Sequence, residues 1–294
     1  MHFKNFPSIL MLFLGMFVYS QEATEIYLFD LIKTEGSYTI KNPVNISNNE
    51  GYDNQPSFRE DGASILFSSF RNDQADIAQY NIEENFRTWI TDTKDVNEFS
   101  PAPYPGKKKF FTCVRFGKDG SQELYKYPFK NKTPVALVPN VQIGYYTWFD
   151  RNSLVSFVLG DIETLQVSNF KYKIKYPIQS YIGRSFNKVP GSVSNGKELI
   201  SFISKSHEVP EIYTINPVDS EVHYLCDALE DSEDFTWTLD GTIFMGRENN
   251  IYQFLPGKSK EWQPIIIDSE IPLKNITRLV VSPNGKKIAV VAGE

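Results

Sequence analysis

Residues 55–82, QPSFREDGASILFSSFRNDQADIAQYNI, decide the fold of this 294-residue chain. Three runs in which apolar and polar residues alternate are separated by two polar turns. Such alternation is typical of β-strands with one buried face, and the polar turns predict antiparallel hairpins. The stretch is either a single meander or one unit of a repeating array, and the rest of the chain distinguishes these cases.

The unit recurs along the whole chain. In each copy an aromatic or apolar anchor residue precedes a polar turn and an apolar strand, and the anchors are Phe58, Tyr104, Trp148, Val193, Trp237 and Val281. Another apolar residue follows seven positions after each anchor, at Ile65, Phe111, Val155, Ile200, Phe244 and Ile288. Successive anchors are 44 to 46 residues apart. A period of about 40 to 45 residues is typical of four-stranded propeller blades, so each copy is predicted to be one blade.

The turns and the later strands of each unit agree with this interpretation. Asp-Gly or Asn-Gly pairs favour two-residue hairpins, and three such pairs are predicted to join the first two strands of a blade: Asp61-Gly62, Asp240-Gly241 and Asn284-Gly285. Third strands are predicted at Asp76-Ile77, Glu123-Leu124-Tyr125, Glu211-Ile212-Tyr213 and Asn250-Ile251-Tyr252. Weaker fourth strands are predicted at 88–91, 135–138, 222–225 and 265–267.

The two ends of the chain are predicted to share one blade. After the last anchor, Val281, a second strand is expected at 287–291, and the third and fourth strands of that unit are missing. Residues 25–29, EIYLF, copy the third-strand motif, and residues 43–46 copy the fourth. Pairing these segments would close the ring and remove its exposed strand edges. The predicted fold is therefore an all-β, six-bladed propeller with four-stranded blades, in which N-terminal strands complete the C-terminal blade.

The register of the fourth unit has two solutions. Residues 182–186, IGRSF, parallel residues 143–147, IGYYT, and this match moves the fourth anchor from Val193 back to Asn187. Residues 191–196 would then be an inserted loop. The number of blades is the same in both solutions.

Residues 1–20 have the pattern of an export signal. Lys4 provides a positive start, an apolar run covers 9–18, and the small residues Val18 and Ser20 precede a cleavage point. An uncleaved membrane anchor is the alternative, but the run is shorter than the roughly 20 residues that a spanning helix needs. We therefore expect a signal peptide at 1–20, a propeller domain at 21–294, and no stable membrane insertion after cleavage.

Charge and cysteine content limit the possible functions. The formal net charge is −6 and the chain has no long block of Lys or Arg, which argues against nucleic acid as a partner. Cys113 and Cys226 lie in different units and are expected to be two buried thiols; a bridge would need a Cα spacing that separate units meet only by chance.

One stretch of the first unit resembles a known repeat. Residues 54–62, NQPSFREDG, with ILFSS at 65–69, Arg71 and Asp76-Ile77, are similar to the WD40-like repeat of TolB-type β-propellers. Residues 282–289, SPNGKKIA, are a second good match, and weaker copies cover essentially the whole mature chain. The resemblance implies a six-bladed propeller in the bacterial envelope, periplasmic or secreted, that acts chiefly as a scaffold for protein–protein contacts. It does not name the partner.

The sequence offers little catalytic or metal-binding chemistry. A peptidase would need a hydrolase domain with a Gly-x-Ser-x-Gly elbow, which is missing. The mature chain has two histidines, His207 and His223, expected on outer strands or loops, so a zinc site with three protein ligands is not predicted. Calcium held by Asp231, Glu233 and Asp234 is the more plausible metal hypothesis, with a solvated turn as the alternative. No cofactor and no catalytic residue is assigned.

A candidate binding surface follows from propeller geometry, which places the start of each first strand beside the central axis. Three to four residues before the anchors stand Asn54, Ser100, Tyr145, Arg184, Asp234 and Arg278. Aromatic, Arg and acidic groups on one rim suit recognition of a peptide or another polar ligand. The alternative is a water-filled plug in which Arg184 or Arg278 pairs with Asp234.

Two hypotheses for function remain. The first is an exported, non-catalytic binding module that contacts a protein or peptide through the rim. The second is a propeller hydrolase or lactonase with a metal or polar site in the channel. The scarcity of histidine favours the first.

Overall fold

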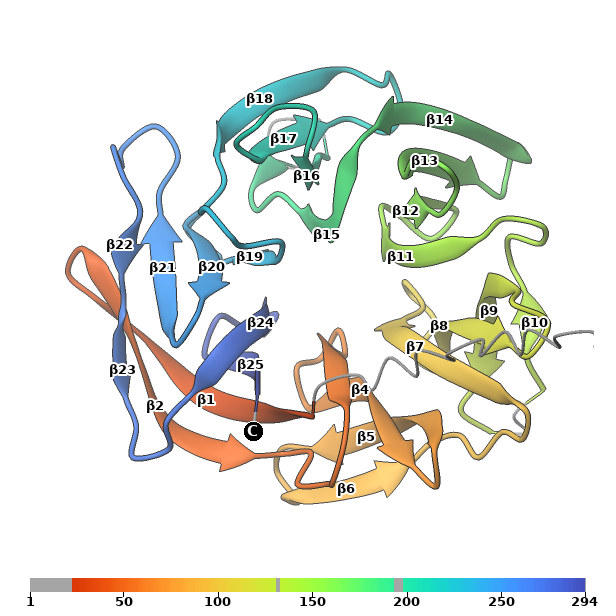
Figure 1. Ribbon diagram of the computed structural model, residues 1–294, viewed down its shortest axis with the longest axis horizontal. Coiled ribbons are helices and arrows are strands. Elements are labelled where there is room, and N and C mark those ends of the chain that lie inside the picture. Colours follow the sequence, from red (N-terminus) through yellow and green to blue (C-terminus); the bar gives the residue numbers. More distant parts are fainter. Residues whose placement is uncertain (1–22, 131–132, 193–197, 294) are drawn as a thin grey trace, which may run out of the picture.

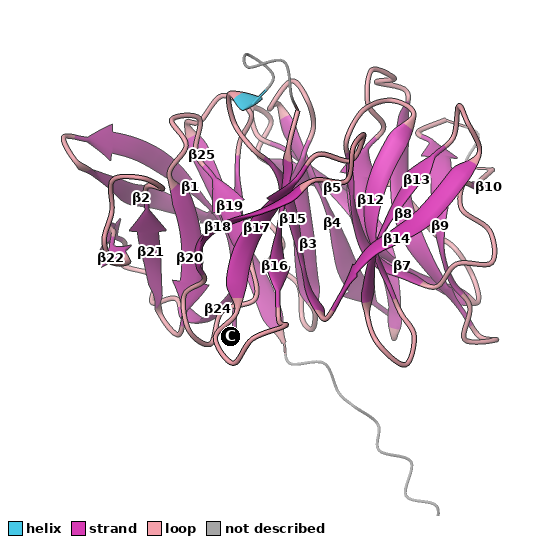
Figure 2. Ribbon diagram, turned by 90° about the horizontal axis from the view of Figure 1, so that it is seen from above, coloured by secondary structure: helices cyan, strands magenta, loops and turns pink. Residues whose placement is uncertain are grey.

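The computed structural model describes residues 23–130, 133–192 and 198–293, and within these ranges the chain forms twenty-five β-strands and no α-helix. The strands lie in six sheets, which surround a central axis as blades (Figure 1). Seen from the side, the blades stand next to one another and form a thick disc (Figure 2). The predicted all-β, six-bladed propeller is therefore confirmed.

The first three blades follow one another along the chain, each running from the axis outward. Blade one comprises β3 (Asp53–Phe58), β4 (Ser64–Arg71), β5 (Gln74–Asn81) and β6 (Phe86–Trp89). Blade two comprises β7 (Val96–Pro103), β8 (Phe110–Gly117), β9 (Gln122–Pro128) and β10 (Val135–Ala136). Blade three comprises β11 (Ile143–Trp148), β12 (Ser153–Val158), β13 (Thr164–Asn169) and β14 (Ile174–Ser180).

The last three blades include the one that closes the ring. Blade four comprises β15 (Ile182–Lys188), β16 (Ile200–Ser204), β17 (Glu211–Ile215) and β18 (Val222–Asp227). Blade five comprises β19 (Phe235–Trp237), β20 (Ile243–Arg247), β21 (Asn250–Phe254) and β22 (Gln263–Pro264). Blade six comprises β24 (Lys274–Val281), β25 (Lys287–Gly293), β1 (Thr24–Thr34), β2 (Ser37–Asn45) and β23 (Ile266–Asp268).

Blade six is assembled from both ends of the chain, as predicted. β1 and β25 pair in antiparallel register, with Ile26 opposite Val291 and Phe29 opposite Ile288. The red β1 and the blue β25 lie side by side in Figure 1. β2 forms the next strand outward, so N-terminal residues supply the third and fourth strands of the C-terminal blade.

The predicted fourth strand of blade five, at residues 265–267, is wrong. β22 supplies that strand instead, and the following residues pair in parallel with β2, where Ile266 lies opposite Thr39. The Ile265 N–H still donates to the Ile251 carbonyl of β21 at 2.9 Å, so the contact with β21 ends one residue after Pro264. From Ile266 onward the chain pairs with blade six and gives that blade a fifth strand.

The Asp-Gly and Asn-Gly turns join the first two strands of their blades, but the prediction of two-residue hairpins is wrong. The connections have five residues each, 59–63, 238–242 and 282–286, and only their glycines have positive φ: Gly62 (+68°), Gly241 (+87°) and Gly285 (+68°). The preceding side chain accepts a hydrogen bond from the N–H group two residues later, at Asp61, Asp240 and Asn284. This side-chain bond stabilises the wider turn without positive φ at the Asp or Asn.

The register of blade four follows the second solution. β15 begins at Ile182 and ends at Lys188, and Asn187 lies opposite Ser201 of β16. The anchor of this blade is thus Asn187. Val193 lies outside the described residues.

The hydrophobic core is divided among the contacts between neighbouring blades. The described residues contain six buried apolar clusters, and each one contains side chains from two adjacent blades. The six apolar residues that follow the anchors by seven positions are all fully buried. Two anchors also connect blades through hydrogen bonds, because Trp148 Nε1 donates to Thr112 Oγ1 at 3.1 Å and Trp237 Nε1 donates to Ser201 Oγ at 2.8 Å.

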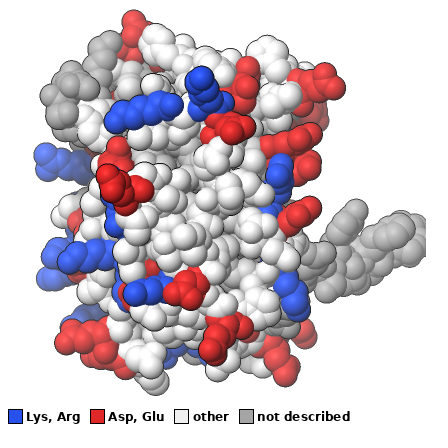
Figure 3. Space-filling model, turned by 90° about the vertical axis from the view of Figure 1, so that its left-hand side faces the viewer, with Lys and Arg blue, Asp and Glu red and all other residues white. Residues whose placement is uncertain are grey.

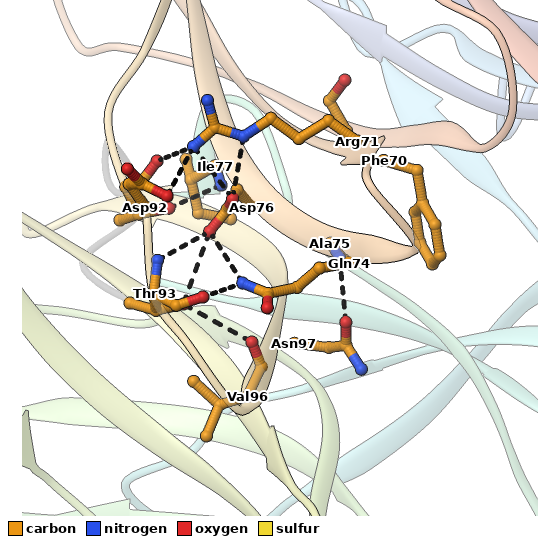
Figure 4. Close-up of polar contacts among 12 residues, drawn as sticks. Phe70, Arg71, Gln74, Ala75, Asp76, Ile77, Asp92, Thr93, Val96 and Asn97 are labelled. Atoms are coloured by element: carbon orange, nitrogen blue, oxygen red, sulfur yellow. Dashed lines mark hydrogen bonds and ion pairs between the residues drawn. The ribbon is translucent and has the colours of Figure 1, made fainter.

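The buried carboxylate of Asp76 holds the end of blade one together (Figure 4). Asp76 is 2% exposed, and its Oδ2 accepts a hydrogen bond from Arg71 Nε at 3.1 Å. Its Oδ1 accepts one from the Thr93 N–H at 3.1 Å, which ties the segment after β6 to β5. The Arg71 guanidinium also stacks on Trp89 at 4.2 Å and lies 3.2 Å from Asp92, whose side chain is 83% exposed.

Replacing Asp76 by Ala is expected to lower the free energy of unfolding by about 2 kcal/mol, because hydrogen bonds to charged groups are lost and donors are left unpaired. Asp92→Ala is the matched control, since Asp92 contacts the same arginine from solvent, and its loss should cost less than about 0.5 kcal/mol. Urea denaturation of both variants gives the two values. Equal losses would contradict the structural role of Asp76.

Other expectations from the sequence can be compared with the described residues. Cys113 and Cys226 are both buried and unbridged. On the face shown in Figure 3, positive and negative side chains are interspersed around a broad uncharged area. Within the described parts of the chain, no helix is long and apolar enough to cross a membrane. The predicted signal peptide at 1–20 lies outside the described residues.

Candidate binding site in the central channel

The six first strands enclose a cavity of about 560 Å³ on the propeller axis. Every blade contributes to its wall, through residues of β3, β7, β11, β15, β19 and β24. One polar or aromatic lining residue from or just before each first strand is used to define one end of the channel. We call this end the channel mouth and define it by Gln55, Ser100, Tyr145, Arg184, Asp234 and Arg278.

The first strands are irregular where they reach the channel mouth. Five of them have a break in their pairing with the second strand, between Asn54 and Ser57, Phe99 and Ala102, Ile143 and Tyr145, Ile182 and Phe186, and Lys274 and Arg278. A β-bulge turns side chains away from the alternation of a regular strand and is common beside binding sites. Gln55, Ser100 and Arg184 lie within these breaks, whereas Tyr145 and Arg278 still pair with the second strands of their blades.

Two of these bulges are connected by the side chain of Gln55. Gln55 and Ser100 both have left-handed backbone, with φ of 59° and 51°, which costs about 1 kcal/mol or more for a residue other than glycine. Gln55 Oε1 accepts hydrogen bonds from the Ser100 N–H at 2.7 Å and from Ser68 Oγ at 2.9 Å. Gln55 thus fixes the walls of blades one and two relative to each other.

Arg278 and Asp234 form a buried ion pair at the channel mouth. Both side chains are 11% exposed, and Arg278 Nη1 lies 3.5 Å from Asp234 Oδ1. The Leu279 N–H donates to Asp234 Oδ2 at 2.8 Å, and the Arg278 guanidinium lies over the Tyr145 ring at 4.8 Å. Burial raises the pKa of Asp234 above its ordinary value, although Arg278 and the Leu279 N–H act in the opposite direction.

Arg184 lies on the same side of the channel, in blade four. Its Nη2 donates to the Thr277 carbonyl at 3.3 Å, and its Nε is 4.0 Å from Glu233 Oε2. Glu233 is already paired with Lys205. Burial raises the pKa of the Tyr52 hydroxyl to about 12, and the charges of Arg278 and Arg184 act in the opposite direction.

Five of the six rim residues predicted from the sequence line the cavity, namely Ser100, Tyr145, Arg184, Asp234 and Arg278. Asn54 does not: it is 5% exposed, and its Oδ1 accepts a hydrogen bond from the N–H of Gln55 at 2.7 Å. The bulge in β3 places Gln55 in the wall instead. Gln55 was missed by sequence reasoning, because counting back a fixed number of residues from the anchor assumes a regular strand.

The channel wall offers few groups for acid–base or metal chemistry. The carboxylates among the lining residues are Glu60 and Asp234, and these lining residues include no histidine or cysteine. His207 lies in the loop before β17 and His223 on the outer strand β18, as expected. In the described ranges no three His, Cys, Asp or Glu side chains gather as a metal site would require. The carboxylates of the calcium hypothesis, Asp231, Glu233 and Asp234, form no such group.

Comparisons with known proteins identify the architecture. No family model and no curated protein matches the chain. Among solved structures, a TolB-type protein from Agrobacterium tumefaciens has a TM-score of 0.67 and 12% identity, over 93% of this chain and 99% of that one. A gluconolactonase from Xanthomonas campestris has a TM-score of 0.58 and 7% identity, over 85% of this chain and 88% of that one.

TolB from Acinetobacter baumannii has a TM-score of 0.57 and 12% identity, over 92% of this chain and 65% of that one. Identities this low establish a shared fold and nothing more specific. The chain therefore has the fold of TolB-like β-propellers, the fold that its repeat predicts.

Proposed function

We propose that this chain is an exported, non-catalytic β-propeller that binds a protein or peptide partner at the channel mouth, in the bacterial envelope. The observation that carries the proposal is the convergence of Tyr145, Arg184 and Arg278, from three different blades, on one open cavity. Tyrosine and arginine are enriched among the few residues that contribute most to binding at protein interfaces. The pattern of residues 1–20 supports export to the periplasm or beyond.

The wall of the channel also fits an extended peptide. Phe58, Trp148 and Phe235 line it below the mouth, as do several prolines, among them Pro56, Pro101 and Pro103. Rigid apolar side chains and rings suit burial of peptide side chains at little cost in conformational entropy. The bulged strands at the mouth supply backbone and side-chain polar groups around this apolar wall.

Replacing Tyr145, Arg184 and Arg278 together by Ala is expected to weaken binding of the natural partner by at least about 100-fold, since residues of this kind each contribute about 1–2 kcal/mol or more at an interface. The partner is captured from an envelope extract with the intact protein, and its affinity for both forms is then measured by calorimetry. The matched control changes Tyr172 and Arg151, which are exposed outside the cavity, to Ala. Retention of every captured partner by the triple variant would refute the proposed site.

The second proposal is a hydrolase or lactonase that acts in the channel. A cavity of about 560 Å³ can hold a sugar-sized substrate, and a lactonase is among the proteins that share this fold. Turnover that a chelator abolishes, together with a metal that copurifies, would support this alternative. Turnover that persists with a chelator would remove its metal-dependent form.

A further inference from the structure

The channel mouth contains hydrogen-bond donors that no described residue satisfies. Arg184 Nε, Arg278 Nη2 and Ser100 Oγ are buried and have no hydrogen-bond partner, and all three residues line the cavity. The 4.0 Å from Arg184 Nε to Glu233 is too long for a hydrogen bond. A buried donor without an acceptor is costly, and the cost is larger for a charged group. These atoms belong to residues of blades four, six and two that line the same cavity.

The charges around this space leave one positive charge in excess. Three cations, Arg184, Arg278 and Lys205, face the two carboxylates Asp234 and Glu233. Glu233 contacts Lys205 closely, and Asp234 divides its oxygens between Arg278 and the Leu279 N–H. The whole chain, in contrast, carries a net charge of −6. The channel mouth is thus a local positive site on a negative protein.

We propose that the channel mouth binds a carboxylate group of an acidic peptide, with Arg184 and Arg278 as its main ligands and Ser100 as an additional donor. This inference rests on the proposed function and specifies the chemistry of the partner. Guanidinium groups match a planar carboxylate with paired N–H donors, and a single negative charge equals the excess at the site. A doubly charged phosphate would exceed that charge.

The carboxylate can come from a peptide C-terminus or from an Asp or Glu side chain, and a peptide library distinguishes the two sources. Random octapeptides are passed over the immobilised protein in two forms, with a free or an amidated C-terminus, and the retained peptides are sequenced. Enrichment of Asp and Glu in the amidated library identifies side-chain recognition. Retention of the free-acid library alone identifies recognition of the chain end. Either result supports the proposal.

The variants test whether the arginines carry this selectivity. Arg184→Gln is expected to reduce the enrichment at least about ten-fold, because a hydrogen bond to a charged group is lost. It should fold normally, since Glu233 keeps Lys205 as its partner. Arg184→Glu should reverse the preference toward Lys and Arg peptides, which a purely structural role of Arg184 would not produce. Arg151→Gln, exposed outside the cavity, is the matched control.

Other outcomes overturn the inference without deciding the proposed function. Retention of neutral or basic peptides by the unaltered protein, lost in the triple alanine variant, would keep the binding site and refute carboxylate recognition. Retention of no peptide, or competition by inorganic phosphate but not by acetate, would also refute it. Loss of the natural partner in the triple alanine variant is measured separately, so the proposed function can survive either result.

Discussion

A chain that ends at Lys286 is expected not to fold. The missing strand, β25, places Ile288, Val290 and Val291 at zero exposure, between blades five, six and one. Each of these side chains contributes about 1.5–3 kcal/mol through burial, and the lost strand also leaves the edges of β1 and β24 unpaired. The summed loss is comparable with the free energy of unfolding of a typical domain, which is about 5–15 kcal/mol.

Circular dichroism and gel filtration of the shortened chain measure this effect, and an unfolded or aggregated product is expected. Two point variants serve as a graded test in the full-length chain. Val290→Asp puts a charge into the same core and should also prevent folding, whereas Lys286→Asp changes an exposed turn residue and should be tolerated. A shortened chain with a native melting transition would show that the closing strand is dispensable.

Replacing Asp53 by Asn is expected to stabilise the protein by up to about 4 kcal/mol at pH 8. Asp53 starts β3 at the contact between blades six and one and is fully buried. Burial raises the pKa of its carboxyl to about 7, and the neighbouring carboxylate of Glu25 acts in the same direction. A shift of about three pKa units corresponds to about 4 kcal/mol.

The sign of the pH dependence follows from the raised pKa. The folded state keeps a proton on Asp53 at a pH where the unfolded state has lost it, so stability falls as the pH rises from about 4 to about 7. Between pH 5 and pH 8 the natural protein should lose about 3 kcal/mol more than the Asn variant. Urea denaturation at both pH values measures the difference. Asp61→Asn, in an exposed turn, is the control, and equal slopes for all three proteins would contradict the assignment.

The number of blades and the closure of the ring could be predicted from the sequence because they depend on periodicity alone. Anchor residues such as Trp148 and Trp237 recur at a fixed spacing, since each must fill the same position between two blades. The third-strand motif at Glu25 was visible for the same reason. The repeat occurs several times in one chain, so its period can be recognised even though one copy, in blade four, is irregular.

Turn lengths and strand pairing were less predictable from the sequence, because local hydrogen bonds make individual turns and strands depart from the regular pattern. Asp61 and Asn284 accept hydrogen bonds from nearby N–H groups, which favours wider turns than the Asp-Gly and Asn-Gly pairs suggest. After Ile265 the chain leaves β21, and the following strand pairs with a different blade. Neither effect changes the hydrophobic pattern, which is the signal that sequence reasoning uses.

Prediction of the candidate site from the sequence was limited in the same way by local geometry. An offset from the anchors located five residues of the channel wall, but it selected Asn54 where a bulge presents Gln55. Bulges have no strong sequence signal, except that Gly144 and Gly183 occur near two of them. The pairing of Arg278 with Asp234, and the donors that stay unpaired, depend on distances between blades and are outside the reach of the sequence.

The shared sixth blade also determines when this protein can become complete. As the chain is synthesised from its N-terminus, β1 and β2 emerge first and can form their hairpin at once. The inner edge of β1 then has no partner until β25, at the opposite end of the chain, has been synthesised. Until that point the edge is open to pairing with other chains, so we expect incomplete chains to be prone to aggregation.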